Sequence, residues 1–142
     1  LGKEPGTEPK VFPYVIPWIK DEMTNKEKDV YFIAASLFAL HPANSESGNM
    51  GTVFRQIQLG SGDSSSIEQR FVHLLNSHSD DLPSRLRHAI GMAKSKNVPV
   101  NYSRLLLDLR YWNSDTRWVQ QKWAEQFWAT VTDDNQSNDN DE

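Results

Sequence analysis

Apolar residues recur three or four positions apart along most of this chain, which is the spacing of one face of an α-helix. The first clear stripe follows Thr24, which stands three residues before Glu27 in a capping-box pattern. His41-Pro42 ends this helix, because proline disfavours helical backbone in the residue before it. A second helix is predicted over about residues 50–59. The inward residues of the two helices are Val30, Ile33, Ala34, Leu37, Phe38, Leu40, Met50, Val53, Phe54 and Ile57.

The loop GSGDSSS, residues 60–66, separates the chain into two halves, and four more helices follow it. Ser, Asn and Asp are good N-cap residues, and Pro83 suits a first helical turn. We therefore expect these helices to start at Ser66, at Asp80 or Asp81, at Asn101, and at Ser114 or Asp115. Their inward stripes are Ile67, Phe71, Leu74 and Leu75; Leu82, Leu86, Ala89, Ile90 and Ala93; Leu105, Leu106, Leu109 and Trp112; and Val119, Trp123 and Phe127.

No stretch sustains an alternation of apolar and polar residues, so we predict an all-α fold of about six to seven helices. The length of 142 residues fits one compact unit or two small helical lobes sharing a core, with the joint near residues 60–66. Pro13 and Pro17 break an apolar segment over residues 11–19, which we expect to pack on the body. The predicted helical domain spans residues 1–132.

The composition indicates a folded protein and excludes several classes of site and of protein. Hydrophobic residues make up 37% of the chain and include five tryptophans, which is enough for a folded core. The chain has no cysteine, which excludes disulfides and cysteine-ligated metal sites. No apolar run approaches the roughly 20 residues of a membrane span, and no secretory signal pattern is present. We expect a soluble, cytoplasmic protein without a membrane partner.

The charge is unevenly distributed, although the whole chain carries a net charge of −4. The tail over residues 133–142 has five acidic residues, no base and no apolar residue, so it is predicted to be disordered. Between Leu82 and Ala124, eight lysines and arginines stand against two aspartates, a net charge of +6. A basic region beside an acidic tail points to an anionic partner, and an ordinary solvated helix surface is the alternative.

No catalytic or metal-binding constellation stands out. His73 and His78 are five residues apart and do not share a helix face, so a metal pair is not expected. Asp80 and Asp81 could act as paired carboxylates, but negative charge at a helix start also stabilises the helix itself. Gly60-Ser61-Gly62 lacks the lysine of a phosphate loop. We therefore expect no enzyme activity, no metal, no cofactor and no small-molecule substrate.

Tryptophans and basic residues interleave near the C-terminus, which leaves two interpretations open. Exposed aromatic rings between cations can stack the bases of a single strand. Trp112 and Trp123, however, fall on apolar stripes, so we expect them in the core. Trp118 and Trp128 are assigned either to an edge of the bundle or to an interface with a partner.

Nine basic side chains are candidates for contact with a nucleic-acid backbone. Arg87 and Lys94 lie two helical turns apart on the face opposite the predicted core, and Gly91 between them leaves the backbone open to a phosphate chain. Arg104 stands four residues before Asp108 and is expected to pair with it. The complete set is Arg55, Arg70, Arg85, Arg87, Lys94, Arg104, Arg110, Arg117 and Lys122.

Three stretches stand in a specific order: PYVIPWI with VYFIAASLFAL, then SIEQRFVHLLNSHSDDLPSRLRHAIGMA, then NYSRLLLDLRYWNSDTRWVQQKWAEQFW. Their joint order and spacing resemble the CasB family, the small subunit of the type I-E CRISPR Cascade complex. They cover most of the chain before the tail, within residues 13–40, 66–93 and 101–128. The family's N-terminal helix has no counterpart here, and the sequence starts at Leu1 rather than Met, so we expect a chain that lacks this helix.

The resemblance implies two packed helical bundles and a second copy of the chain in a head-to-tail pair. It also implies contacts with the large subunit and with the backbone subunits that carry the crRNA. In the family, a basic surface holds the displaced non-target strand of the target DNA and stabilises the R-loop, without catalysis. A helical adaptor whose basic face docks an acidic protein is the alternative. The basic positions that match the family pattern are Arg70, Arg85, Arg87, Arg104 and Arg117.

Overall fold

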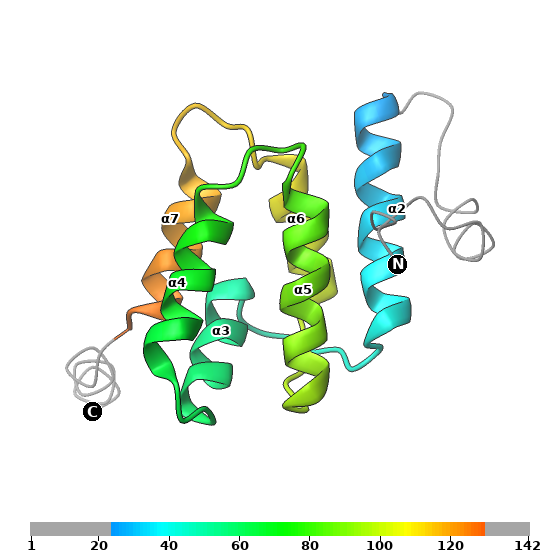
Figure 1. The fold of residues 1–142 in the computed structure, drawn as a ribbon. Helices are drawn as coiled ribbons and strands as arrows, with labels where there is room; N and C mark the ends of the chain where they lie inside the picture. Colours follow the sequence, from blue (N-terminus) through cyan, green and yellow to red (C-terminus); the bar gives the residue numbers. More distant parts are fainter. Residues whose placement is uncertain (1–23, 130–142) are drawn as a thin grey trace, which may run out of the picture.

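The computed structural model describes residues 24–129, and these residues form six α-helices. Within this range the backbone forms no β-strand, only an isolated parallel bridge between Asn44 and Val100. The prediction of an all-α fold is confirmed (Figure 1). The predicted apolar segment 11–19 and the acidic tail 133–142 lie outside the described residues. In chain order the helices are α2 (Asn25–Leu40), α3 (Met50–Leu59), α4 (Ser64–Leu75), α5 (Leu82–Ser95), α6 (Tyr102–Arg110) and α7 (Trp118–Phe127).

The residues immediately before α2 and α6 confirm the capping predictions. The Thr24 hydroxyl accepts a hydrogen bond from the backbone N–H of Glu27 at 3.1 Å. The Asn101 side chain accepts one from the backbone N–H of Arg104 at 3.1 Å. Each bond satisfies a donor that the first turn of a helix leaves without a partner.

Two predicted helix starts are wrong. Helix α4 begins before Ser66, because Asp63 Oδ1 accepts from the Ser66 N–H at 3.2 Å and so acts as the cap. Helix α7 begins at Trp118, later than the predicted cap at Ser114 or Asp115. The Ser114 carbonyl accepts from the Arg117 N–H at 3.0 Å and closes a turn, which delays the helix. Arg117 then enters α7 with a left-handed φ of 53°.

All six described helices contribute to one continuous core. Helix α2 packs against α5 and α6, and α3 packs against α4, α5 and α7. Figure 1 shows α5 between α4 and α2. The predicted division into two lobes near residues 60–66 stays a prediction. One fully buried side chain from each helix illustrates the core, namely Leu37, Phe54, Phe71, Leu86, Leu105 and Trp123.

A glycine permits a close contact between α3 and α7 in the core. A Cβ atom added to Gly51 would lie 1.9 Å from the backbone oxygen of Trp123, so a larger residue cannot fit without separating α3 from α7. The Asn49 side-chain amide donates to the Lys122 carbonyl at 3.2 Å and ties the same two helices at the start of α3. Backbone contact of this kind fixes how α7 sits on the rest of the fold.

A buried histidine joins the end of α2 to the chain before α6, and the sequence pattern did not indicate it. His41 Nε2 lies 2.7 Å from the Val98 carbonyl oxygen. The Tyr102 hydroxyl donates to the His41 carbonyl at 2.5 Å, and burial raises the pKa of this phenol well above its usual range. Among the described helices, none has the length and apolar character needed to cross a membrane.

Candidate nucleic-acid interface

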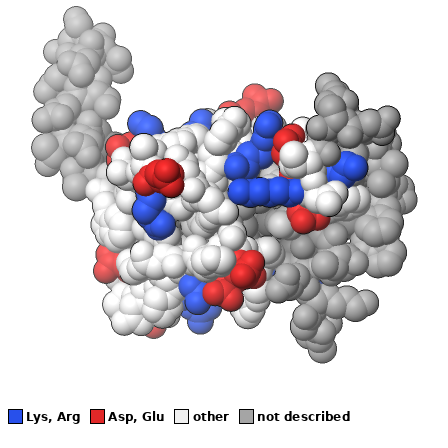
Figure 2. Space-filling view, turned by 90° about the horizontal axis from the view of Figure 1, so that it is seen from above, with Lys and Arg blue, Asp and Glu red and all other residues white. Residues whose placement is uncertain are grey.

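The nine predicted basic residues are spread over five helices and one loop. Helix α3 carries Arg55, α4 carries Arg70, and the loop before α7 carries Arg117. On the face that Figure 2 shows, lysine and arginine side chains lie among aspartates and glutamates rather than in one continuous basic area. How strongly each cation would attract a phosphate therefore depends on the charges of its immediate neighbours. The remaining residues are Arg85, Arg87 and Lys94 on α5, Arg104 and Arg110 on α6, and Lys122 on α7.

Arg104 belongs to a buried polar network, as its spacing to Asp108 predicted. Arg104 Nε lies 3.1 Å from Asp108 Oδ1, and Trp123 Nε1 donates to Asp108 Oδ2 at 2.7 Å. The Asp108 side chain is only 1% exposed. The ion pair with Arg104 holds Oδ1, and the indole N–H holds Oδ2. Burial raises the pKa of Asp108, against the opposing effects of the Trp123 hydrogen bond and the Arg104 charge.

Arg85 and Arg117 both bind the C-terminal turn of α4. Arg85 Nη1 donates to the His73 carbonyl at 2.7 Å and to the Ser77 hydroxyl at 3.0 Å. Arg117 Nη2 donates to the Leu75 carbonyl at 2.7 Å. Cations at this end satisfy free carbonyls and complement the helix dipole. Both side chains remain exposed, and a guanidinium has five N–H donors, so each can still contact a phosphate.

Arg110 and Lys122 form loose surface ion pairs. Arg110 Nη2 lies 3.9 Å from Glu27 Oε2, and Lys122 Nζ lies 3.5 Å from Glu125 Oε2. Exposed pairs of this kind contribute little to stability, about 0–1 kcal/mol. They do, however, offset the positive charge that a phosphate chain would meet at these two positions.

The predicted pair on α5 is only partly as expected. Lys94 is exposed and forms no hydrogen bond or ion pair with the described residues, whereas Arg87 is half-buried and has an interaction of its own. Arg87 stands two residues after Arg85, which is about 200° around a helix, so it points away from the α4 side. The backbone at Gly91 is open as predicted, since an added Cβ would meet no atom within 4 Å.

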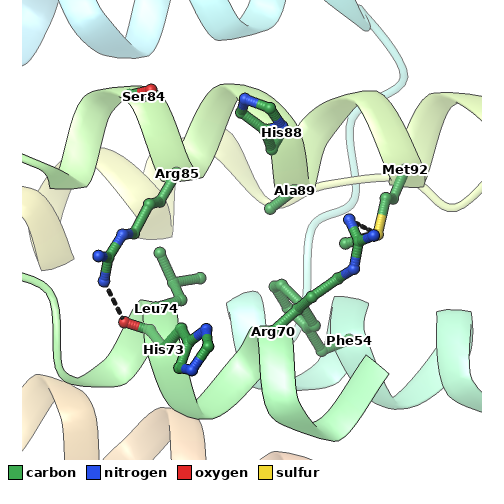
Figure 3. A pocket seen from close by; sticks show the side chains of 9 residues that line it. All are labelled: Phe54, Arg70, His73, Leu74, Ser84, Arg85, His88, Ala89 and Met92. Carbon is green, nitrogen blue, oxygen red and sulfur yellow. Dashed lines mark hydrogen bonds between the residues drawn. The ribbon is translucent and has the colours of Figure 1, made fainter. Parts of the chain in front are cut away.

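A hollow between α4 and α5 brings together residues that the sequence stripes did not connect. Its volume is about 280 Å³, and side chains of both helices and of α3 line it (Figure 3). Arg70 and Arg85 are the two predicted basic residues that the fold brings together here. Their exposure could be predicted from the helix faces, but the packing of α4 on α5 was needed to see that they share a hollow. The lining consists of Phe54, Arg70, His73, Leu74, Ser84, Arg85, His88, Ala89 and Met92.

The tryptophans divide as the apolar stripes predicted. Trp112 and Trp123 are buried, and their rings pack with centroids 4.9 Å apart. Trp118 is half-buried beneath the Arg104 guanidinium, whose carbon lies 5.9 Å from the ring centroid. Trp128 is 43% exposed and donates through Nε1 to Glu68 at 2.9 Å. Trp118 and Trp128 thus lie at edges of the bundle, and their assignment to an interface with a partner stays a prediction.

The described residues contain no group of three or more His, Asp or Glu side chains placed to hold a metal ion. His73 and His88 both line the hollow, and His78 Nδ1 lies 3.5 Å from the Asp80 carboxylate on the surface. Asp81 stands at the N-cap of α5 without a side-chain capping bond, which agrees with its assignment to a helix start.

Comparison with known proteins places the chain in a family. Its residues 1–128 match the family described as CRISPR-associated protein Cse2. A protein of that description from Thermus thermophilus is 32% identical over 130 residues, which cover 91% of this chain and 74% of the relative.

Solved structures of this kind have the same fold. The crystal structure of a Cse2-family protein from Thermus thermophilus matches with a TM-score of 0.78 at 29% identity, covering 90% of this chain and 80% of that chain. The crystal structure of M. ruber CasB matches with a TM-score of 0.76 at 32% identity, covering 94% and 82%. Because the family match spans almost the whole chain before the acidic tail, the protein belongs to the CRISPR-associated protein Cse2 family, as its resemblance to CasB predicted.

Proposed function

We propose that this protein is a non-catalytic nucleic-acid-binding subunit of a type I-E Cascade complex, where it holds the displaced DNA strand and stabilises the R-loop. Membership of a CRISPR-associated family supports the role in antiviral defence. The partners in this proposal are the large subunit, the backbone subunits, a second copy of the chain, the crRNA and the target DNA with its non-target strand. The cytoplasm is the proposed site of action.

The observation that carries the proposal is the exposed basic surface of α4 and α5. Arg70, Arg85 and Lys94 are all exposed there, and none forms an ion pair with a described carboxylate. The hollow that Arg70 and Arg85 border has no aspartate or glutamate in its lining. Cations without acidic neighbours keep their full attraction for phosphates, which supports strand binding at this surface.

Modest contacts are sufficient for this role. The heteroduplex formed in an R-loop is about as stable as the DNA duplex that it replaces, so small contributions from protein–backbone contacts can shift the balance. Such contacts need positive charge but do not read bases, which fits a helical surface without a recognition motif. No catalytic group is required, and the proposal assigns none.

The experiment measures binding of the purified chain to random single-stranded DNA over a salt series. The proposal predicts that log Kd varies linearly with log salt, and that unrelated sequences bind alike. Lys94→Gln should make the slope shallower by about 0.7 if it removes one phosphate contact. Binding to an acidic protein without binding to DNA would instead support the adaptor function and contradict this proposal.

A further inference from the structure

The accessible lining of the hollow between α4 and α5 is made largely of basic and titratable side chains. Arg70 and His73 reach it from α4, and Arg85 and His88 reach it from α5. All four residues are exposed, whereas Phe54, the contribution of α3, is buried. Figure 3 shows Arg85 and Arg70 at opposite ends of the hollow, with His88 between them along α5. The surface that a ligand would meet therefore combines two guanidinium groups with two imidazoles.

No carboxylate balances these groups within the hollow. The three helices that line it, α3, α4 and α5, contain a single acidic residue, Glu68. Glu68 accepts a hydrogen bond from Trp128 Nε1 at 2.9 Å and is not part of the lining. Asp81 stands at the N-cap of α5 and does not line the hollow either. The charged or titratable side chains in the lining are thus the two arginines and the two histidines.

The two imidazoles of the hollow are not engaged by the part of the chain that the structure describes. Neither the His73 ring nor the His88 ring forms a hydrogen bond or ion pair with residues 24–129, since Arg85 binds the His73 carbonyl rather than its ring. The other two histidines differ: His41 is buried against a backbone carbonyl, and His78 lies beside a carboxylate. Histidine is the side chain whose charge ordinarily changes between about pH 5 and 8.

The neighbouring charges indicate which ligand the imidazoles suit. Two guanidinium groups repel a metal cation, so an anion is the ligand that fits this lining. A protonated imidazole has two N–H donors, and a negative charge within about 4–6 Å favours this protonated form. A phosphate bound in the hollow supplies the negative charge that the lining itself lacks. Binding of a phosphate and protonation of the histidines therefore favour each other.

We propose that His73 and His88 link strand binding to protons: phosphates of a single strand bind at Arg70 and Arg85, and the two histidines take up protons as the strand binds. The inference rests on the proposed strand-holding function and adds that pH regulates the same surface. Because protons are bound together with the strand, binding tightens as the pH falls from about 8 to about 6. Unrelated sequences respond alike, since phosphate contacts do not read bases.

The first test titrates the unmodified chain with oligothymidine at these two pH values and constant salt. The phosphodiesters and thymines of this probe keep their charge over the range. The affinity should rise at least about five-fold on acidification, which corresponds to the attraction of one imidazolium for one phosphate in water. Equal affinity at both pH values would leave the strand-holding function standing and refute the proton link. If the probe does not bind at either pH in low salt, both proposals fail.

The second test removes or fixes the charge of the two histidines, which are both exposed. His73→Gln/His88→Gln retains N–H donors without a titratable group, so it should bind like the unmodified chain at the higher pH and should not tighten at the lower pH. His73→Lys/His88→Lys carries the positive charges at both pH values. It should bind at least about five-fold more tightly than the unmodified chain at the higher pH, and its affinity should also not depend on pH.

The matched control is His78→Gln, the same exchange at an exposed histidine outside the hollow. This variant should tighten on acidification as much as the unmodified chain does. Circular dichroism shows whether each variant folds, and the lysine variant decides if the glutamine variant does not. Tightening that persists in the folded double variants, or that His78→Gln loses to the same extent, overturns the proposal.

Discussion

In the α6–α7 region, the Arg104 guanidinium lies 3.1 Å from a buried carboxylate, whereas in the α4–α5 region Arg70 and Lys94 face solvent without a described acidic partner. All three residues were candidate phosphate contacts in the sequence, although the spacing of Arg104 to Asp108 already indicated a pair. The comparison shows that the burial of neighbouring groups decides whether a positive charge is engaged within the fold or stays exposed to solvent. Asp108 accounts for the difference between Arg104 and the two exposed cations, because a buried carboxylate requires a cation nearby.

The largest effect is expected from removing that carboxylate. Asp108→Ala leaves the buried Trp123 N–H without an acceptor and takes the charge partner from Arg104. Leaving this buried N–H unpaired costs about 1–3 kcal/mol of unfolding free energy, and the cavity left by the carboxylate adds to the loss. Urea denaturation measures the loss, with the exposed Ser103→Ala as a control. A loss below about 1 kcal/mol would show that the α6–α7 region does not depend on this network.

The two helical glycines should respond in opposite directions. Gly51→Ala would force a Cβ against the Trp123 backbone and is expected to destabilise the protein by about 1–3 kcal/mol. Gly91→Ala meets open space on α5 and should stabilise the protein by up to about 1 kcal/mol through helix propensity. Thermal melting of both variants makes the comparison. Equal effects would contradict the close α3–α7 contact.

Substitutions of Arg104 and Lys94 should have smaller effects, one on stability and the other on DNA binding. Arg104→Ala should lower the unfolding free energy by about 1 kcal/mol, because Arg104 is one-third exposed and solvent weakens its pairing with Asp108. It should leave DNA affinity almost unchanged. Lys94→Ala should do the reverse, changing stability by less than about 0.5 kcal/mol while weakening DNA binding. Urea denaturation and DNA titration of both variants test this. A larger loss of DNA affinity for Arg104→Ala than for Lys94→Ala would contradict the structural role of Arg104.

The smallest effect concerns pH. Burial raises the pKa of Asp108 above the ordinary value of 3.8, so the folded protein binds this proton more tightly than the unfolded chain. The contribution of Asp108 to stability is therefore present below pH 3.8 and is lost as the pH rises through the folded pKa. Relative to Asp108→Asn, the unmodified protein should gain stability as the pH falls from neutral towards 3.8. A relative loss on acidification would show that the Arg104 charge dominates.

Much of the fold could be predicted from periodicity and capping. The stripes that placed Trp112 and Trp123 in the core are confirmed, because burial of an amphipathic face follows directly from the spacing of apolar residues. The start of α7 was wrong, since a turn closed by Ser114 and Arg117 depends on backbone contacts that no single residue signals. His41 was missed for a related reason: its partner, Val98, is distant in sequence.

The candidate site was less predictable than the fold. Helix faces indicated that Lys94 is exposed, and residue spacing indicated the pairing of Arg104 with Asp108. They could not indicate that Arg85 and Arg117 bind carbonyls of α4, because these contacts join separate helices and loops. The hollow between α4 and α5 also arises only from the packing of the two helices. A pattern along one helix reports burial, but it does not report which other helix lies opposite.

The most direct test of the central claim is the lifetime of the R-loop in a Cascade complex reassembled with Arg70→Glu/Lys94→Glu. Both side chains are exposed, so the variant should fold and assemble normally. Loss of these two phosphate contacts should shorten the lifetime at every salt concentration, to the same extent for unrelated target sequences, whereas Ser103→Glu should stay close to the unmodified complex. An unchanged R-loop lifetime in a normally folded double variant would contradict the claim that the α4–α5 surface holds the displaced strand.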